Sequence, residues 1–198
     1  MMQMEEELRN TCGHEALPQR GSREGAVSWF AMRVTYRREM KVKAEMDALG
    51  VQAFVPMQRI VRKGRRLSNA LEPAIHNLIF IRASEEEVQL LKASRPELLY
   101  MVRKMDGKTE KIVVPDRQMA DFMKVCTESP GFVEILPQAG KIQLRPGQEV
   151  MVVSGPLQGV RGYFLHVDGH RARRLVISIP GVCAATLQVE ADEVTSIP

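Results

Sequence analysis

Cysteine is scarce in this chain, and its positions are scattered. The three cysteines, Cys12, Cys126 and Cys183, are odd in number and far apart in sequence. A disulfide framework or a zinc site needs paired or clustered ligands, so this spacing argues against both. We expect three separate thiols that are small, buried or incidental, because free cysteine is among the most buried residue types.

Long hydrophobic runs are also missing. No window of the sequence reaches the roughly 18 uninterrupted apolar residues that a membrane span needs. The first residues carry Glu5, Glu6 and Glu7 where a secretory signal would carry positive charge and then an apolar run. We therefore expect a cytoplasmic protein with no membrane partner.

The sequence shows no set of side chains with the spacing of a catalytic or metal site. His166 and His170 have the spacing of half a zinc finger, but no cysteine pair precedes them. The glycine-rich run 155–162 lacks the Gly-Lys-Ser/Thr ending of a phosphate loop. A hydrolase built on His166 and Asp168 would have nothing at the right spacing to complete it. We expect no enzyme activity, no metal and no other cofactor.

The overall composition is that of an ordinary globular protein. The chain has 198 residues, of which 44% are hydrophobic and 26% charged, enough for one ample core or two modest ones. The net charge of +4 and the isoelectric point near 9.1 are mildly basic. This balance permits contact with nucleic acid without requiring it.

The apolar run from Ile75 to Ile81 is the strongest local signal in the first part of the chain. It is β-branched and aromatic, and His76 and Asn77 are its polar positions. Seven residues is strand length, and so apolar a run needs cover on both faces. Pro73 would open the strand, where a missing N–H is tolerated. The sequence therefore predicts a strand in the middle of a sheet.

The flanking segments predict further strands and helices around that strand. Strands are expected at 27–34, 51–55, 98–104 and 111–114, with a hairpin over 57–71. Helices are expected from Arg37 to Gly50, from Ser84 to Ala93, and from Pro115 or Asp116 to Cys126. Gly50 suits a helix end, and Ser84 with Glu87 forms a capping box. Together these elements predict an α+β domain, in which helices flank a mainly antiparallel sheet.

The composition changes after Pro146. Short apolar segments with glycine between them predict strands at 150–153, 160–167, 174–179 and 186–190. This regular spacing is typical of a small all-β barrel. The expected organisation is a flexible tail over 1–26, a first domain over 27–127, a linker over 128–145 with a short strand at 141–144, and a barrel domain over 146–198.

One run in the barrel domain resembles a known motif. Residues 146–162 are similar to the KOW motif of the NusG transcription factors, and the expected turn consists of Gly155, Pro156, Gly159 and Gly162. The first domain strengthens the resemblance through Trp29-Phe30, Phe54-Val55-Pro56, Pro73, Phe80 and Val113-Val114-Pro115-Asp116. The long tail and the altered central strand resemble specialised paralogues such as RfaH and UpxY. The chain is thus identified as similar to a NusG-family factor.

The resemblance implies a transcription elongation and antitermination factor that acts by binding. The first domain would bind the RNA polymerase clamp, through Arg33, Ile75, Leu78 and Phe80. Non-template DNA would contact basic side chains of the first helix and of the hairpin tip, namely Arg37, Arg38, Lys41, Lys63, Arg65 and Arg66. The KOW barrel would recruit the ribosome or a termination factor, and the protein would act as a monomer. Analogy with RfaH suggests specific operons, such as those for surface polysaccharides.

Several alternatives stay open from the sequence alone. Ile75, Leu78 and Phe80 could be plain sheet core, and a basic hairpin tip is often merely solvated. The whole chain could be a KOW-domain RNA-binding or ribosome-associated protein that acts without polymerase. RfaH is known for a C-terminal domain that can be helical, but 176–189 is rich in β-formers, so we expect a permanent barrel here.

Overall fold

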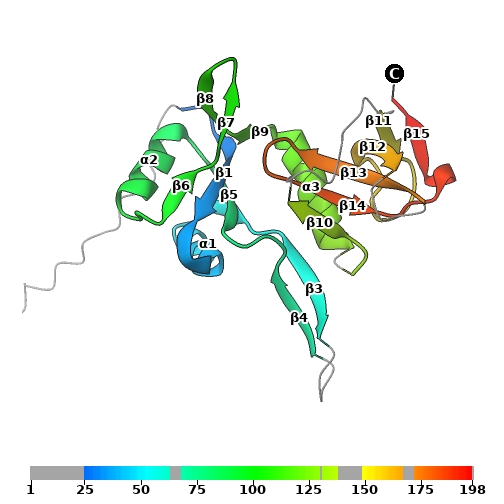
Figure 1. Cartoon of the computed structure of the whole chain (residues 1–198), viewed down its shortest axis with the longest axis horizontal. Helices are drawn as coiled ribbons and strands as arrows, with labels where there is room; N and C mark the ends of the chain where they lie inside the picture. The colour runs from blue at the N-terminus through cyan, green and yellow to red at the C-terminus, as the bar shows by residue number, and fades with distance from the viewer. Residues whose placement is uncertain (1–24, 63–67, 130, 138–148, 167–171, 198) are drawn as a thin grey trace, which may run out of the picture.

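The structure is a computed structural model that describes residues 25–62, 68–129, 131–137, 149–166 and 172–197. A mixed helix and sheet domain occupies one side, and a second sheet occupies the other, with α3 (Asp116–Glu128) between them (Figure 1). Much of the predicted tail, the hairpin tip with Lys63, Arg65 and Arg66, and the predicted strand at 141–144 lie outside the described residues.

An antiparallel sheet forms the centre of the first domain. Its strands are β1 (Ser28–Val34), β2 (Gln52–Phe54), β5 (Leu78–Ala83), β6 (Leu98–Tyr100) and β9 (Val113–Val114). The order is β2-β5-β1-β6, and β9 also pairs with β1. Within this sheet β5 lies between β1 and β2, so the predicted central strand is confirmed in position.

The start of the central strand differs from the prediction. Pro73 is the last residue of β4 (Ser68–Pro73), and Ile75 lies in a bend before β5 begins at Leu78. His76 and Asn77 form a turn, and Asn77 has a φ of 65°. Asparagine tolerates this left-handed conformation better than most residues, which allows the chain to reverse from the hairpin into β5.

The two faces of the first sheet support separate cores. Phe30 and Met32 on β1 join Ile79 and Ile81 on β5 in a cluster that α1 (Glu39–Ala48) and α2 (Glu85–Ala93) cover. The alternate positions, among them Trp29 and Phe80, face the other way and pack with α3. This alternation follows from the two-residue period of a strand. The arrangement matches the predicted α+β domain.

Local signals set the end of α1 and the start of α2 as the sequence predicted. Gly50 follows α1 with a φ of 66°, and its N–H donates to the carbonyl of Asp47. At the start of α2, the Ser84 hydroxyl accepts from the Glu87 N–H at 3.2 Å, and the Glu87 carboxylate accepts from the Ser84 N–H at 2.9 Å. The capping box thus satisfies two N–H groups that a helix end otherwise leaves without partners.

Removing this cap gives a first test of the fold. Ser84→Ala is expected to lower the free energy of unfolding by about 1 kcal/mol, because the Glu87 N–H loses its acceptor in a buried position. Urea denaturation would measure the change. The matched control is Ser154→Ala at an exposed serine, which should change stability by less than about 0.5 kcal/mol. Equal effects of the two substitutions would contradict a stabilising cap.

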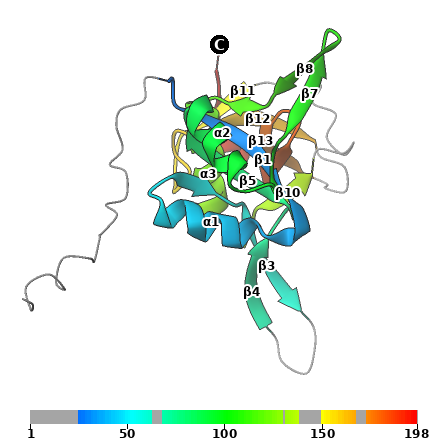
Figure 2. The same cartoon turned by 90° about the vertical axis from the view of Figure 1, so that its left-hand side faces the viewer.

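Two hairpins project from opposite ends of the first sheet (Figures 1 and 2). One consists of β3 (Met57–Arg62) and β4, paired from Met57–Pro73 to Arg62–Ser68. The other consists of β7 (Val102–Met105) and β8 (Lys108–Lys111). Its turn, Asp106-Gly107, has φ values of 51° and 77°, as a two-residue hairpin turn requires.

The C-terminal part forms an antiparallel sheet in the order β10-β14-β13-β12-β11-β15. Its strands are β10 (Glu134–Pro137), β11 (Glu149–Val152), β12 (Arg161–His166), β13 (Arg173–Ile179), β14 (Cys183–Leu187) and β15 (Val194–Ser196), the last after the short helix η2 (Ala191–Glu193). β10 falls in the segment predicted to be an irregular linker, yet it pairs with β14 from Glu134–Thr186 to Pro137–Cys183. The C-terminal sheet therefore begins earlier in the chain than its composition suggested.

Candidate functional site

The residues predicted to bind the polymerase clamp gather on the α3 side of the first sheet. Arg33 and Leu78 are directly opposite each other in the β1–β5 register, and Phe80 is two residues further along β5. Arg33 is exposed and Ile75 is partly buried, whereas Leu78 and Phe80 are buried. The fold therefore brings the four predicted positions to one face, but leaves mainly Arg33 and Ile75 open to a partner.

Phe80 packs against α3 and belongs to the core of the first domain. Its ring centroid lies 5.9 Å from that of Phe122, in an edge-on arrangement. Phe54 on β2 also meets Phe122 edge-on, at 6.3 Å. Such pairs add to the stabilisation that comes from burying the rings themselves. The structure thus supports the core interpretation of Phe80.

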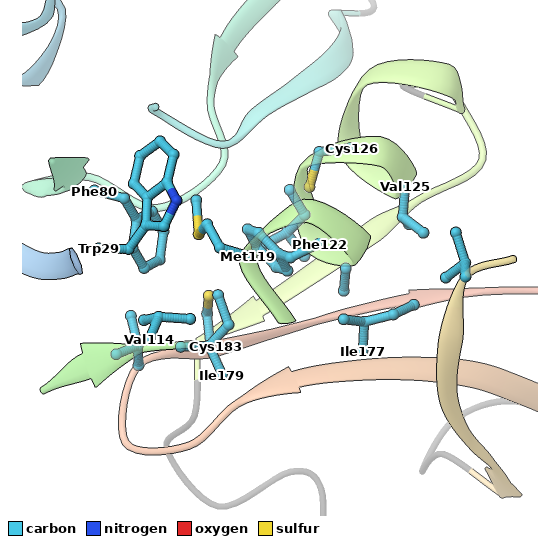
Figure 3. Packing of buried hydrophobic residues seen from close by; sticks show 14 of the residues in the cluster. Trp29, Phe80, Val114, Met119, Phe122, Val125, Cys126, Ile177, Ile179 and Cys183 are labelled. Carbon is cyan, nitrogen blue, oxygen red and sulfur yellow. The ribbon is translucent and has the colours of Figure 1, made fainter. Parts of the chain in front are cut away.

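The C-terminal sheet packs on this same cluster. Ile177, Ile179 and Cys183 point toward α3, where Met119 and Phe122 meet them (Figure 3). In the β13–β14 turn, a Cβ added to Gly181 would come within 3.0 Å of Ile112 Cδ1. The apolar core of the first domain thus continues without a break into the C-terminal sheet.

Polar contacts accompany this apolar interface. The Gln118 amide of α3 donates to the Ser178 carbonyl at 2.6 Å, and Lys124 donates to the Gln158 carbonyl at 2.8 Å. Asp121 accepts from the backbone N–H of Arg161 across the interface, and burial raises the pKa of its carboxyl despite that bond and the nearby cations. The two sheets are thus held together by directional contacts as well as by apolar packing.

Sequence reasoning did not foresee this docking. The available signal was in α3, where Met119, Phe122 and Cys126 are apolar and buried. Val125 is apolar as well and is also fully buried, so the apolar surface of the helix is wider than one sheet requires. A wide apolar surface is typical of a helix that packs between two layers.

Two thiols lie in the interface cluster. Burial raises the pKa of Cys126 on α3 to about 12. Burial also raises the pKa of Cys183 on β14 far above its ordinary value, and the neighbouring Cys126 adds a smaller effect in the same direction. Both cysteines are free. They behave as small buried hydrophobic groups, as expected.

The basic residues predicted for DNA contact at the first helix lie together on the surface. Arg37, Arg38 and Lys41 are exposed at and just before the start of α1. The side of the sheet that carries α1 faces away from the C-terminal sheet (Figures 1 and 2). These cations therefore remain accessible while the two sheets are packed together. The sequence reasoning missed Tyr36 beside them, a residue that is 83% exposed.

The glycines of the KOW-like run lie where the backbone favours glycine. Gly155 and Gly159 have φ values of 75° and 86°, which favour glycine. Gly162 lies so close to β13 that a Cβ there would approach the Val176 carbonyl oxygen to 2.7 Å. Pro156 is exposed between the first two. The run thus reverses the chain between β11 and β12 and then packs tightly against β13.

The described residues contain no group of three or more His, Cys, Asp or Glu side chains that could hold a metal ion. In the same part of the chain, no helix has the length and apolar character needed to cross a membrane. A cleft of about 330 Å³ lies between α3 and the C-terminal sheet, where Arg117, Asp121 and Tyr163 contribute to its lining.

Comparisons with known proteins relate the first domain to one family. Residues 27–123 match the family described as "NusG: Transcription termination factor nusG". A solved structure described as "Domain interaction in Thermotoga maritima NusG" is similar over 87% of this chain and 98% of that chain, with 18% sequence identity and a TM-score of 0.43. No curated protein matches the sequence. Residues 27–123 of this chain thus form a NusG-family domain.

Proposed function

We propose that this protein is a transcription elongation factor that binds RNA polymerase through its N-terminal domain and suppresses pausing or termination. The observation that carries the proposal is the NusG-family match over residues 27–123. Arg33 and Ile75, at one end of the α3-side face, would make the first contacts with the polymerase clamp. The activity needs no bond chemistry, since binding one polymerase conformation better than another shifts its population.

The position of the C-terminal sheet affects which part of the first domain the polymerase clamp could contact. Leu78 and Phe80 lie in the cluster that also holds Ile177 and Ile179. A clamp that reached deep into this face would compete with the C-terminal sheet for the same apolar surface. Polymerase would then favour an arrangement in which the C-terminal sheet is separated from α3. The size of this shift would depend on how much more tightly polymerase binds that arrangement than the docked one.

Two further partners belong to the proposed function, namely non-template DNA and a partner of the C-terminal sheet. Exposed Arg37, Arg38 and Lys41 would contact non-template DNA, and Lys63, Arg65 and Arg66 of the hairpin tip would add to that contact. Clustered cations beside a phosphate backbone bind through the release of counterions. The KOW-like C-terminal sheet would bind the ribosome or a termination factor, with the protein acting as a cytoplasmic monomer. The specialised character proposed from the sequence would restrict this action to particular operons.

Capture of core RNA polymerase by the immobilised full chain tests the proposal. Arg33→Glu and Ile75→Asp are each expected to reduce capture by about tenfold or more, the loss that changing a hot-spot residue of an interface typically causes. These positions suit the test because their side chains are not fully buried. Leu78 is 2% exposed, so a charge there would disrupt the core in addition to any interface.

The matched controls make the same changes of charge on other surfaces. Arg103→Glu lies on the exposed β7 strand, and Leu90→Asp lies on α2, on the far side of the sheet. Both should capture polymerase as well as the unmodified chain does. If the unmodified chain retained no polymerase, the proposal would fail, and binding to ribosomes or RNA in the same assay would favour the alternative KOW-protein function.

A further inference from the structure

The cleft between α3 and the C-terminal sheet contains two buried hydrogen-bond donors. Ser178 is 5% exposed, and its hydroxyl has no hydrogen-bond partner among the residues that the structure describes. Within the same part of the chain, the buried Nε–H of Arg161 has no partner either. Both residues line the cleft, which has a volume of about 330 Å³. Because a buried donor without a partner loses the hydrogen bonds that it would make in water, such groups are rare in folded proteins.

The strand register brings these two donors together. Tyr163 of β12 is opposite Val176 of β13, and the pairing of the two strands ends at this position. Arg161 and Ser178 each lie two residues beyond it, so they share the face of the sheet that carries Tyr163 and Val176. Here the Ser178 carbonyl accepts from the Gln118 amide of α3 at 2.6 Å. The cleft therefore opens where the paired strands give way to α3.

The start of α3 forms the other wall of the cleft. Pro115, Arg117 and Gln118 belong to this helix end and line the cleft. No side chain in the described ranges caps the helix. The N–H groups of its first turn therefore lack a side-chain acceptor, and the positive end of the helix dipole lies at the cleft. Such a helix end favours an anion.

The charged side chains at the cleft nearly cancel one another. Arg117 and Arg161 line it together with Asp121 and Glu149. Asp121 already accepts from the Arg161 backbone N–H and has Arg117, Arg161 and Lys124 as cationic neighbours. Glu149 is exposed to solvent. The helix end and the two buried donors therefore decide which ligand fits, and both select a group that carries negative charge and accepts hydrogen bonds.

We infer that this cleft binds a small molecule through a phosphate or carboxylate group and thereby holds the C-terminal sheet on α3. The oxyanion would accept from the Ser178 hydroxyl, the Arg161 Nε–H and the first N–H groups of α3, and Tyr163 would contact the rest of the molecule. Because α3 and the C-terminal sheet each supply part of the site, the ligand binds the docked arrangement and favours it. The inference goes beyond the proposed function, since it requires no polymerase.

Nuclear magnetic resonance of the ¹⁵N-labelled full chain tests the binding, with phenyl phosphate and benzoate as probes and chloride keeping the ionic strength constant. We expect saturating shifts of the Arg161 Nε–H signal and of the Arg117 and Gln118 backbone signals. The probe that binds more tightly identifies the acidic group of the ligand. Ser178→Ala should weaken binding by about tenfold, because a hydrogen bond to a charged group is lost. This variant should fold as stably as the unmodified chain, since it removes a hydroxyl without a partner.

Thiol reactivity tests whether the ligand holds the two sheets together. In a Cys12→Ser variant, a probe at ten times its dissociation constant should slow the reaction of Cys126 and Cys183 with a disulfide reagent by about tenfold, because both thiols lie in the cluster that α3 shares with the C-terminal sheet. An unchanged rate with bound probe would overturn the claim that the ligand favours docking.

The controls are Ser154→Ala and Arg103→Gln, which change an exposed serine and an exposed arginine that are not among the residues lining the cleft. Both should bind the probes as the unmodified chain does. Full affinity in Ser178→Ala, or shifts that do not saturate and spread over exposed cations, would contradict a built site. Absence of binding by either probe would show that water alone satisfies the two donors, and this outcome would also overturn the inference.

Discussion

Phe122→Ala is expected to lower the free energy of unfolding by about 3–5 kcal/mol, the usual cost of removing a buried phenylalanine ring. Phe122 is fully buried in α3, and its ring meets Phe54 and Phe80 edge-on. The cluster around it extends into the C-terminal sheet, so the cavity would lie between two sheets that cannot both close on it. Few single substitutions in this chain should cost more.

Denaturation followed by tryptophan fluorescence would measure the effect. Trp29 is the one tryptophan of the chain and lies in the same cluster, so its emission reports on this core directly. Phe132→Ala is the matched control, because Phe132 is largely exposed and its loss should change stability by less than about 0.5 kcal/mol. A loss below about 1 kcal/mol in Phe122→Ala would mean that the ring is not enclosed as the structure describes.

Features with a local cause could be predicted from the sequence. Gly50 ends α1 and Ser84 and Glu87 cap α2, each at the expected position, and the turn-forming pair Asp106-Gly107 connects β7 to β8. In every case a few adjacent residues dictate the backbone by their own φ preferences or side-chain hydrogen bonds. The order of strands and helices in the first domain followed from these signals and from the hydrophobic periods.

Features that depend on distant partners could not be predicted in the same way. Pro73 was expected to open the central strand, but it ends β4, because Asn77 provides the reversal four residues later. β10 is too short to be distinguished from a linker until β14 pairs with it. The burial of Phe80 was left open because core packing and partner contact favour the same apolar side chains.

The residues of the candidate site also include some that the sequence alone could predict and some that depend on distant partners. The basic residues Arg37 and Arg38 could be identified from their charge alone, and they lie on the surface as expected. The backbone at Arg37 is held by a hydrogen bond to the Asn77 side chain, forty residues further along the chain, so no local pattern indicates it. The docking of the C-terminal sheet on α3 is a tertiary feature of the same kind, and it decides which predicted clamp residues are accessible.

Thiol reactivity gives the largest effect that the structure predicts. Burial raises the pKa of Cys126 from 9.0 to about 12, which lowers its thiolate fraction near neutral pH by about a thousandfold. The pKa of Cys183 is raised as well. A thiolate of higher pKa is also more nucleophilic, which offsets part of this loss. In a Cys12→Ser variant, both remaining thiols should therefore react with a disulfide reagent at pH 8 at least about thirtyfold more slowly in the native protein than in denaturant.

The same assay can detect separation of the two sheets. If polymerase competes with the C-terminal sheet for the α3-side face, stoichiometric core polymerase should accelerate the reaction of Cys126 and Cys183, because both lie in the shared cluster (Figure 3). Arg33→Glu, with its weakened capture, should need more polymerase for the same acceleration. Fast labelling in the native protein alone would contradict the docked arrangement. Protection that persists on captured polymerase would instead show that the clamp binds at Arg33 and Ile75 while the C-terminal sheet stays in place.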